Sequence, residues 1–279
     1  MLKHSFCHIP GIGSKLERKL WLQGVHTWES LLNSPPTGVL SPSRHEKVIG
    51  HLRESAEQLR VENAPFFSRW LPPDEQWRLF SDFRHSIAYI DIESTGSRQG
   101  LDHITTVALY DGTSVKCYVH GRNLDSFPDD IAQYRLLVTY NGKSFDVPFI
   151  EQYFGIRITA AHIDLRFGLA SLGYTGGLKG CERQLGIDRG PLDGFDGYLA
   201  VLLWHEYVRT RDERALETLL AYNIQDVVNL EPLLVHVYNE KLKKAPFDCA
   251  RAPSSTLPVT PYAPHSEVLS RVRGSSLAL

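Results

Sequence analysis

Ala88-Tyr89-Ile90-Asp91-Ile92-Glu93-Ser94-Thr95-Gly96 is a short apolar run that ends in two acids. Side chains alternate across a strand, so Asp91 and Glu93 point to one face while Ile92 packs beneath. Carboxylates this close repel unless a cation neutralises them, and hard oxygen ligands suit Mg²⁺ or Mn²⁺. A strand that runs out into a polar turn is the ordinary alternative. Ser94, Thr95 and Gly96 fit a turn whose backbone N–H groups can approach a phosphate.

Further sequence patterns typical of strands and helices follow this run along the chain. Apolar runs predict strands over 87–92, 104–110, 114–119, 136–140 and, more weakly, 158–163. Asp111-Gly112 predicts a hairpin between the second and the third. Helical patterns cover 147–153, 178–185, 198–208 and 215–230. Three meandering strands followed by alternating helices and strands predict an α/β fold with a mixed sheet flanked by helices.

A third acid, Asp146, ends the segment Tyr140-Asn141-Gly142-Lys143-Ser144-Phe145-Asp146. It follows a predicted strand and begins a helical stretch that contains Pro148, which the first turn of a helix tolerates. Asp146 is therefore either a helix N-cap or a metal ligand, and this segment alone favours neither. Asn141 and Lys143 are candidates for nucleic-acid contacts, although an exposed turn lysine is the ordinary interpretation of Lys143.

The fourth acid, Asp226, lies in Tyr222-Asn223-Ile224-Gln225-Asp226. Tyr222 and Asp226 are four residues apart on a predicted helix and share a face. A phenol beside divalent cations can orient a water molecule, and its ordinary pKa near ~10 makes it a weak base. An aromatic core residue next to a surface acid is the alternative. We expect Asp164 and Asp196 to cap helices or turns. The histidines show no zinc-protease spacing, so we expect no catalytic zinc.

The remaining composition sets limits on the class of protein. With 279 residues and a net charge of −2, the chain can form one sizeable domain plus an appendage and has no global positive field. The four cysteines form no C-x-x-C pair, which indicates free thiols and no structural zinc. No signal peptide or membrane span is apparent, so we expect a cytoplasmic protein with no membrane partner and no small organic cofactor.

Four zones organise the chain. Residues 1–60 are helical and modestly basic, and 61–80 form an aromatic-rich connector that packs on the main domain. The main domain covers 81–245. Residues 250–279 contain several prolines and no periodicity, which predicts a disordered tail.

The motifs, taken in order, resemble the DEDD exonuclease superfamily, also called DnaQ-like, on an RNase H-like fold. Asp91-x-Glu93, Asn141-x-x-x-Phe145-Asp146 and Tyr222-x-x-x-Asp226 carry the resemblance, and the tyrosine is typical of its DEDDy branch. Leu178-Lys179 and Leu185-Gly186-Ile187 are similar to the segment between motifs two and three. The amino-acid sequence around Asp146 and Asp226 most resembles that of the YprB-type RNase H-like subfamily.

This resemblance implies a 3′→5′ exonuclease that acts on a single strand or frayed end with two Mg²⁺ or Mn²⁺ ions. Asp91, Glu93, Asp146 and Asp226 would be the ligands, and Tyr222 would position the water. The alternatives are an RNase H-like endonuclease on hybrid or branched substrates, or a non-catalytic nucleic-acid-binding adaptor. The spacing of Tyr222 and Asp226 disfavours the first alternative, and the intact acid set disfavours the second.

A second resemblance lies near the N-terminus. Pro10-Gly11-Ile12-Gly13-Ser14-Lys15 resembles the turn of a helix-hairpin-helix, where backbone N–H groups at a helix N-terminus meet a DNA phosphate without reading bases. Gly11, Gly13 and Lys15 are the candidate contacts. DNA is slightly favoured over RNA as the substrate strand, although no residue of the sequence reveals a contact to the 2′-hydroxyl that would distinguish them. An ordinary helical hairpin whose glycines only form the turn is the alternative.

Overall fold

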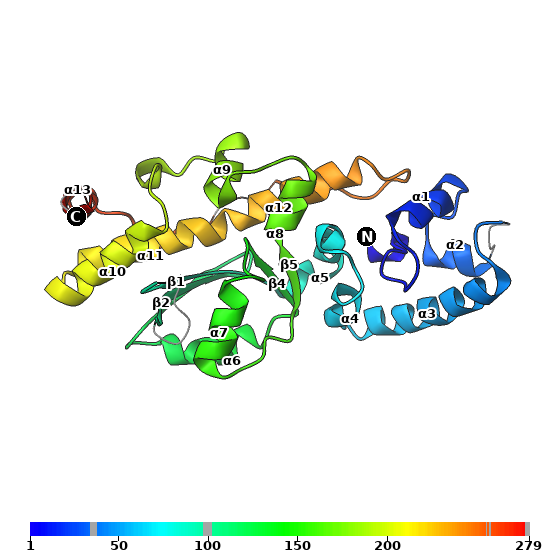
Figure 1. Cartoon of the computed structure of the whole chain (residues 1–279), viewed down its shortest axis with the longest axis horizontal. Coiled ribbons are helices and arrows are strands. Elements are labelled where there is room, and N and C mark those ends of the chain that lie inside the picture. The colour runs from blue at the N-terminus through cyan, green and yellow to red at the C-terminus, as the bar shows by residue number, and fades with distance from the viewer. Residues whose placement is uncertain (34–37, 97–101, 255, 257, 277–279) are drawn as a thin grey trace.

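A five-stranded sheet forms the centre of the protein, which a computed structural model describes over residues 1–33, 38–96, 102–254, 256 and 258–276. The strand order is β3-β2-β1-β4-β5 (Figure 1). The strands are β1 (Ile87–Ser94), β2 (Ile104–Tyr110), β3 (Val115–Val119), β4 (Leu136–Thr139) and β5 (Ala161–Asp164). β2 runs antiparallel to β1 and β3, whereas β4 runs parallel to β1 and β5. The predicted mixed α/β sheet is confirmed, and its weakest strand begins at Ala161 rather than Ile158.

Helices cover both faces of this sheet. One face packs on α6 (Phe127–Ile131), which follows the short η4 (Leu124–Ser126), and on α7 (Asp146–Phe154). The other face packs on α8 (Leu165–Ser171), α11 (Glu213–Val228) and α12 (Leu230–Leu242). Ile90 and Ile92 belong to the core on the α7 side, whereas Tyr89 belongs to the core on the α11 side. Because side chains alternate along a strand, Asp91 and Glu93 share the face that α11 covers.

A long connection leads from α8 to α11. It contains α9 (Gly177–Gln184), η5 (Gly190–Leu192) and α10 (Tyr198–Thr210), which packs along α11. α10 ends at Thr210, and the next residue, Arg211, has a left-handed φ of 58° that reverses the chain. Asp212 then caps α11 by accepting a hydrogen bond of 3.1 Å from the Arg214 backbone N–H. The connection therefore brings residues far from β1 in sequence to the face of the sheet that carries the two acids.

The N-terminal helices lie at the end of the molecule opposite α10 (Figure 1). They are η1 (Leu2–His4), α1 (Ser14–Leu22), α2 (Trp28–Asn33) and α3 (Pro42–Arg60). The connecting segment contains α4 (Ala64–Ser68), η2 (Pro73–Leu79), α5 (Phe80–Phe83) and η3 (Arg84–Ser86). Phe67, Trp77 and Phe80 are buried in one hydrophobic cluster with residues of the sheet and of α12. The aromatic connector thus packs on the main domain.

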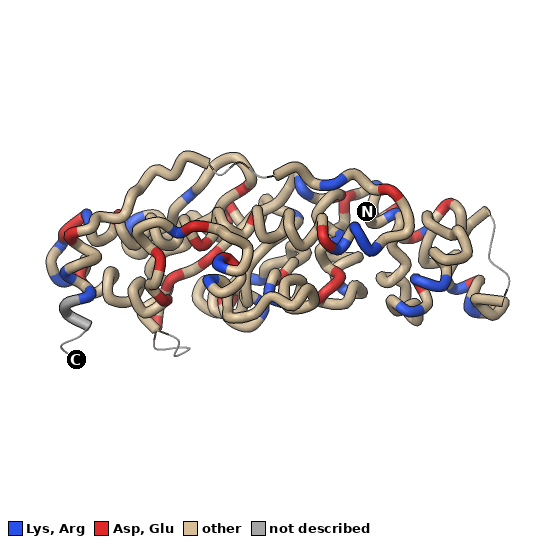
Figure 2. The backbone as a smooth tube through the Cα atoms, turned by 90° about the horizontal axis from the view of Figure 1, so that it is seen from above, with Lys and Arg blue, Asp and Glu red and all other residues tan. Residues whose placement is uncertain are grey.

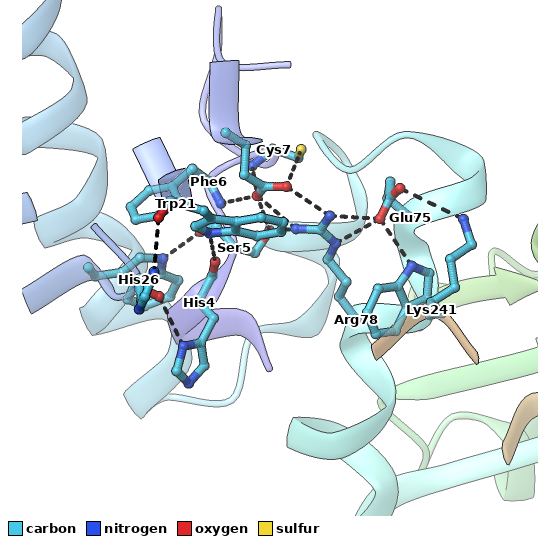
Figure 3. A network of polar contacts seen from close by, with 12 residues as sticks. His4, Ser5, Phe6, Cys7, Trp21, His26, Glu75, Arg78 and Lys241 are labelled. Atoms are coloured by element: carbon cyan, nitrogen blue, oxygen red, sulfur yellow. Dashed lines mark hydrogen bonds and ion pairs between the residues drawn. The ribbon is translucent and has the colours of Figure 1, made fainter. Parts of the chain in front are cut away.

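A buried ion pair fastens α1 to this connector (Figure 3). Both guanidinium nitrogens of Arg78 donate to the Glu17 carboxylate, at 2.7 and 2.9 Å. Glu17 also accepts hydrogen bonds from the backbone N–H groups of Phe6 and Cys7. Arg78 donates in addition to Glu75, which lies 3.7 Å from the Lys241 amine on α12. The network therefore reaches from α1 to the main domain.

Residues 250–279 were predicted to form a disordered tail, but residues 266–276 of this segment form a helix. Residues 255, 257 and 277–279 lie outside the described residues. Helix α13 (Ser266–Ser276) packs on α10 and α11, and Val268, Leu269 and Val272 are buried there. The His265 backbone N–H donates to the Thr218 hydroxyl at 3.1 Å. Three apolar residues on one helix face give this segment the buried area that holds it in place.

Charges of both signs are interspersed along the described chain (Figure 2). Among the helices of the part that the structure describes, none combines the length and the apolar composition needed to cross a membrane.

Candidate active site

Strand β1 and helix α11 bring three carboxylates together. Asp91 and Glu93 extend from the end of β1, and Asp226 lies on α11, which packs across that strand. One oxygen from each carboxylate lies within 4.8 Å of the others. Tyr222 precedes Asp226 by one helical turn and is buried beside it.

Asp146 joins this group from the other side of β1. It is the first residue of α7, and Phe145 rather than Asp146 occupies the capping position. Its Oδ1 accepts a hydrogen bond of 3.3 Å from the Ile92 backbone N–H, so the carboxylate is tied to β1 between the two other acids. A cavity of about 660 Å³, which we call the carboxylate cavity, is lined by Asp91, Glu93, Asp146, Tyr222 and Asp226. The five residues predicted from the motifs thus share one cavity.

Burial and mutual repulsion make this cluster unfavourable in its charged form. Desolvation, followed by the negative charges of Glu93 and Asp226, raises the pKa of Asp91 well above its ordinary value. The pKa of Glu93 is also raised well above its ordinary value, first by desolvation and then by the charge of Asp226. Desolvation raises the pKa of Asp146 to about 7. A buried set of oxygen ligands with excess negative charge fits a hard divalent cation, which would relieve the repulsion.

Asn223 fixes the orientation of Asp91. Its side-chain amide donates to Asp91 Oδ2 at 2.7 Å and to the Asp91 backbone carbonyl at 3.2 Å. Its own carbonyl oxygen accepts a hydrogen bond of 3.1 Å from the hydroxyl of Thr106 on β2. Asn223 was not predicted as a site residue, although it lies directly after Tyr222.

Arg189 holds Asp226 in a buried network. Its guanidinium donates to Asp226 Oδ1 and, at 2.8 and 2.9 Å, to the two carboxylate oxygens of Glu182. Glu182 accepts a further hydrogen bond of 2.7 Å from Asn229. Arg189 and Glu182 are 4% and 0% exposed, so neither charge is stabilised by bulk water. No spacing rule identifies Arg189, because its position depends on the long connection between α9 and α10.

Lys179 contacts Tyr222 from α9. Its amine donates to the Tyr222 hydroxyl oxygen and lies 4.5 Å from the centre of the ring. Burial, followed by the charge of Asp226, raises the pKa of Tyr222 above its ordinary value. The phenol therefore keeps its proton and can orient a water molecule as a hydrogen-bond donor. The only sequence signal for Lys179 is its place in the Leu178-Lys179 segment.

The predicted nucleic-acid contacts beside the acids separate into two groups. Asn141 lines the carboxylate cavity, with a left-handed φ of 64° and its Oδ1 accepting a 2.7 Å hydrogen bond from Arg166. The Lys143 amine instead donates to Gln76 at 2.6 Å, and Lys143 is absent from the residues that line the cavity. Lys143 was predicted to contact a phosphate, but its amine is instead bound to Gln76 of η2, which packs beside it.

The turn after β1 is bound to its own neighbours. The Ser94 hydroxyl donates to the Gly96 carbonyl, and the Thr95 hydroxyl donates to Asp102 at 3.2 Å. None of Ser94, Thr95 and Gly96 belongs to the described lining of the carboxylate cavity. Thr95 lines a different cavity, next to α10.

The N-terminal candidates lie apart from the acids: α1 is at the right end of Figure 1, whereas the acids belong to β1, α7 and α11. Gly11 has a left-handed φ of 85°, and its carbonyl accepts a hydrogen bond from Arg44. Gly13 is the residue before α1, and both Gly13 and Lys15 are exposed. The first turn of α1 therefore offers backbone N–H groups to solvent at this end.

The expected capping roles are confirmed for two further acids. Asp164 precedes α8 and accepts a hydrogen bond of 3.1 Å from the Arg166 backbone N–H. It also accepts from the backbone N–H groups of Asn141 and Lys143, so it shapes the turn that carries Asn141. Asp196 accepts a hydrogen bond of 3.0 Å from the Tyr198 backbone N–H at the start of α10.

Comparison with known proteins adds the following similarities. A model of the RNase_H superfamily matches residues 88–238, which is more than half of the chain. An uncharacterized protein called YprB from Bacillus subtilis (strain 168) is 29% identical over 129 residues, covering 39% of this chain and 29% of that protein. The match thus spans less than a third of this relative's length.

Two solved structures are similar at a TM-score of 0.41. One is the family B DNA polymerase from the hyperthermophilic archaeon Pyrobaculum calidifontis, with 18% identity over 56% of this chain and 24% of that chain. The other is described as the apo form of a nuclease, with 22% identity over 57% of this chain and 74% of that chain.

Proposed function

Because the chain belongs to the RNase_H superfamily, we propose that its carboxylate cavity hydrolyses phosphodiester bonds of nucleic acid, as a metal-dependent 3′→5′ exonuclease on single strands. The observation that carries the proposal is the convergence of Asp91, Glu93 and Asp226, whose oxygens lie within 4.8 Å of one another. Asp146 lines the same cavity. A cluster of half-buried and buried acids that lines a cavity is typical of a functional site.

These four carboxylates would hold two Mg²⁺ or Mn²⁺ ions. When bound, such ions supply electrostatic stabilisation of the charge that develops on the attacking and leaving oxygens of a phosphodiester. The donor set fits this role because it contains only carboxylate oxygens, the ligands that hard cations prefer. The raised pKa values of Asp91, Glu93 and Asp146 support the same interpretation, since close cations favour the charged carboxylates.

The surrounding side chains have distinct tasks in this proposal. Tyr222 would orient the attacking water through its hydroxyl group, whose oxygen accepts a hydrogen bond from the Lys179 amine. Asn223 and Arg189 hold Asp91 and Asp226 in fixed orientations. Asn141 and the backbone of Gly176 and Gly177 line the space that the terminal nucleotide would enter.

DNA is the favoured substrate strand, with RNA as the alternative. The support comes from the resemblance of the turn before α1 to a helix-hairpin-helix that meets a DNA phosphate. Gly13 and Lys15 are exposed there, at the start of the helix. Gly11 contributes the left-handed turn that precedes this helix. Phosphate contacts of this kind position a strand without reading its sequence.

The test uses two 5′-labelled single strands of one sequence, one with a free 3′ hydroxyl and one ending in an inverted nucleotide, in Mg²⁺ and in Mn²⁺. We expect a ladder that shortens from the 3′ end on the free strand and no products from the blocked one. Equal cleavage of both strands would replace the exonuclease with an endonuclease. Binding in EDTA without products in either metal would replace it with a nucleic-acid-binding adaptor. DNA and RNA versions run in parallel report the preferred sugar.

A further inference from the structure

A second cavity lies next to the C-terminal half of α10, and its polar lining is basic. Its volume is about 760 Å³. We call it the basic cavity, after Arg122, Arg209, Arg211, His103, His120 and His205 in its lining. None of the described residues that line it carries a carboxylate. Its composition is thus opposite to that of the carboxylate cavity.

The floor of the basic cavity is aromatic. Trp204 and Tyr207 are buried there, and the rings of His103 and His120 lie 4.5 Å apart beside Trp204. The Arg122 and Arg211 guanidinium groups lie 5.5 and 6.0 Å from the centre of the Tyr207 ring. Aromatic rings combined with guanidinium groups form a surface suited to the base and phosphate of a nucleotide.

The arginines differ in how far their charge is already neutralised. Arg122 donates to both carboxylate oxygens of Glu213, at 2.6 and 2.8 Å, and Arg209 donates to Glu206 at 2.6 Å. Arg211 is exposed and forms no ion pair with a carboxylate among the described residues. It also has a left-handed φ of 58°, a conformation that costs an arginine more than a glycine. Of the three arginines in this lining, Arg211 is therefore the one that no described carboxylate pairs with.

The basic cavity lies on the same edge of the sheet as the acids. Thr95, which lines it, follows Glu93 by two residues, and extended backbone advances about 3.3 Å per residue. α10 also connects the two cavities: Asp196 and Gly197, directly before its first residue, line the carboxylate cavity, and its last turns line the basic one. A strand with its 3′ end in the first cavity can therefore continue into the second.

We propose that the basic cavity is a second nucleic-acid subsite, which binds a nucleotide phosphate of the substrate strand through Arg211 at a distance from the cleaved bond. This inference rests on the proposed function for the identity of the strand. The ligand chemistry is an aromatic base with a phosphate, and a free nucleotide has the same chemistry. The experiment separates these two sources.

The test measures binding in Ca²⁺, a hard cation that carboxylate oxygens can hold, and the length of each strand is checked afterwards so that cleavage does not enter the measurement. A labelled single DNA strand of about 20 nucleotides, longer than the ~4–16 nucleotides that one single-strand-binding module covers, is compared with a dinucleotide and with a nucleoside monophosphate. The variant is Arg211→Asn, because asparagine tolerates the left-handed conformation. The matched control is Arg157→Asn, which removes one charge from an arginine that is 83% exposed and absent from both cavity linings.

We expect Arg211→Asn to weaken binding of the long strand about fivefold, and to reduce the slope of log K against log salt by about 0.7 for the lost phosphate contact. If the dinucleotide binds at the carboxylate cavity alone, Arg211→Asn should bind it as the wild type does, and Arg157→Asn should change neither ligand. Unchanged affinity of Arg211→Asn for the long strand would overturn the subsite. A loss confined to the nucleoside monophosphate would also overturn it, in favour of a free-nucleotide site. If the wild type cleaves no strand but Arg211→Asn still weakens binding of the long strand, the proposed cleavage is refuted and the subsite is not.

Discussion

The Asn223 amide nitrogen lies 2.7 Å from Asp91 Oδ2, so the helix that supplies Tyr222 and Asp226 also fixes the first acid of β1. Asn223 bonds the Asp91 backbone carbonyl as well, and Thr106 holds the amide from β2. One turn of α11 therefore carries Tyr222 and Asp226 and also holds Asp91 in a fixed orientation. Rigid orientation of ligands by neighbouring hydrogen bonds raises their affinity for a cation.

Replacing Asn223 should weaken cation binding more than it weakens folding. For Asn223→Ala we expect activity at limiting Mg²⁺ to fall about 10–100-fold, with partial recovery at high Mg²⁺, because Asp91 loses its orienting donor. A Mg²⁺ titration of the cleavage rate measures the effect. Asn239→Ala is the matched control, since Asn239 bonds the Ala252 backbone away from the site. An unchanged Mg²⁺ dependence of Asn223→Ala would show that this contact has no role in the site.

Removal of Arg189 should destabilise the metal-free protein strongly. Arg189→Met leaves Glu182 and Asp226 without their shared counter-charge, and we expect the free energy of unfolding to fall by about 3–5 kcal/mol. Urea denaturation at pH 8 in EDTA measures this loss. The double variant Glu182→Met/Arg189→Met should recover part of it, because one of the two uncompensated charges is then gone. A loss in the single variant as small as that of an exposed arginine would contradict the buried network.

The ion pair between Glu17 and Arg78 should control how firmly the N-terminal helices are attached. Glu17→Gln removes the charge that faces a guanidinium flanked by Trp21 and Trp77, at 5.6 and 5.5 Å. We expect a loss of about 3 kcal/mol in stability and faster proteolysis of the connector over 61–80, since the buried Arg78 keeps its charge. Glu57→Gln is the control, because its ion pair with Arg60 is exposed. Equal protease resistance of both variants would refute this role.

His8 should make the protein less stable in acid. Burial lowers the pKa of His8 from 6.5 to about 3, so the folded state stays neutral where the unfolded state binds a proton. Stability therefore falls as the pH drops from about 6.5 towards 3, by up to about 1.4 kcal/mol per pH unit. His8→Phe, in a pocket formed by Trp28 and Phe67, should reduce this slope relative to the wild type. Urea midpoints between pH 4 and pH 7 test the prediction, and identical slopes would contradict it.

The sequence predicted those parts of the site that depend on local periodicity. Asp91 and Glu93 share a face because they alternate along β1, and Tyr222 and Asp226 share a face because they are one helical turn apart. These relationships hold within one element and need no knowledge of its neighbours. The mixed sheet could be predicted for the same reason, from apolar runs of strand length.

Partners between distant segments could not be predicted in this way. Asn223 occupies a spacer position within its motif, and Arg189 meets Asp226 only because the connection after α9 folds over α11. Lys143 points to Gln76 because the connector packs on the main domain. In the tail, the prediction of disorder was based on the prolines and ignored the apolar face of α13. That face is buried only because it packs on α10 and α11.

The most direct test of the central claim is a cleavage time course on 5′-labelled single-stranded DNA in Mg²⁺, with the wild type, Asp226→Asn and Asp125→Asn. Asp125 is an exposed acid outside the carboxylate cavity and serves as the control. We expect a ladder that shortens from the 3′ end for the wild type and for Asp125→Asn, and a rate about a hundredfold lower for Asp226→Asn, which lacks one proposed metal ligand. A ladder formed by Asp226→Asn at the wild-type rate would contradict the central claim.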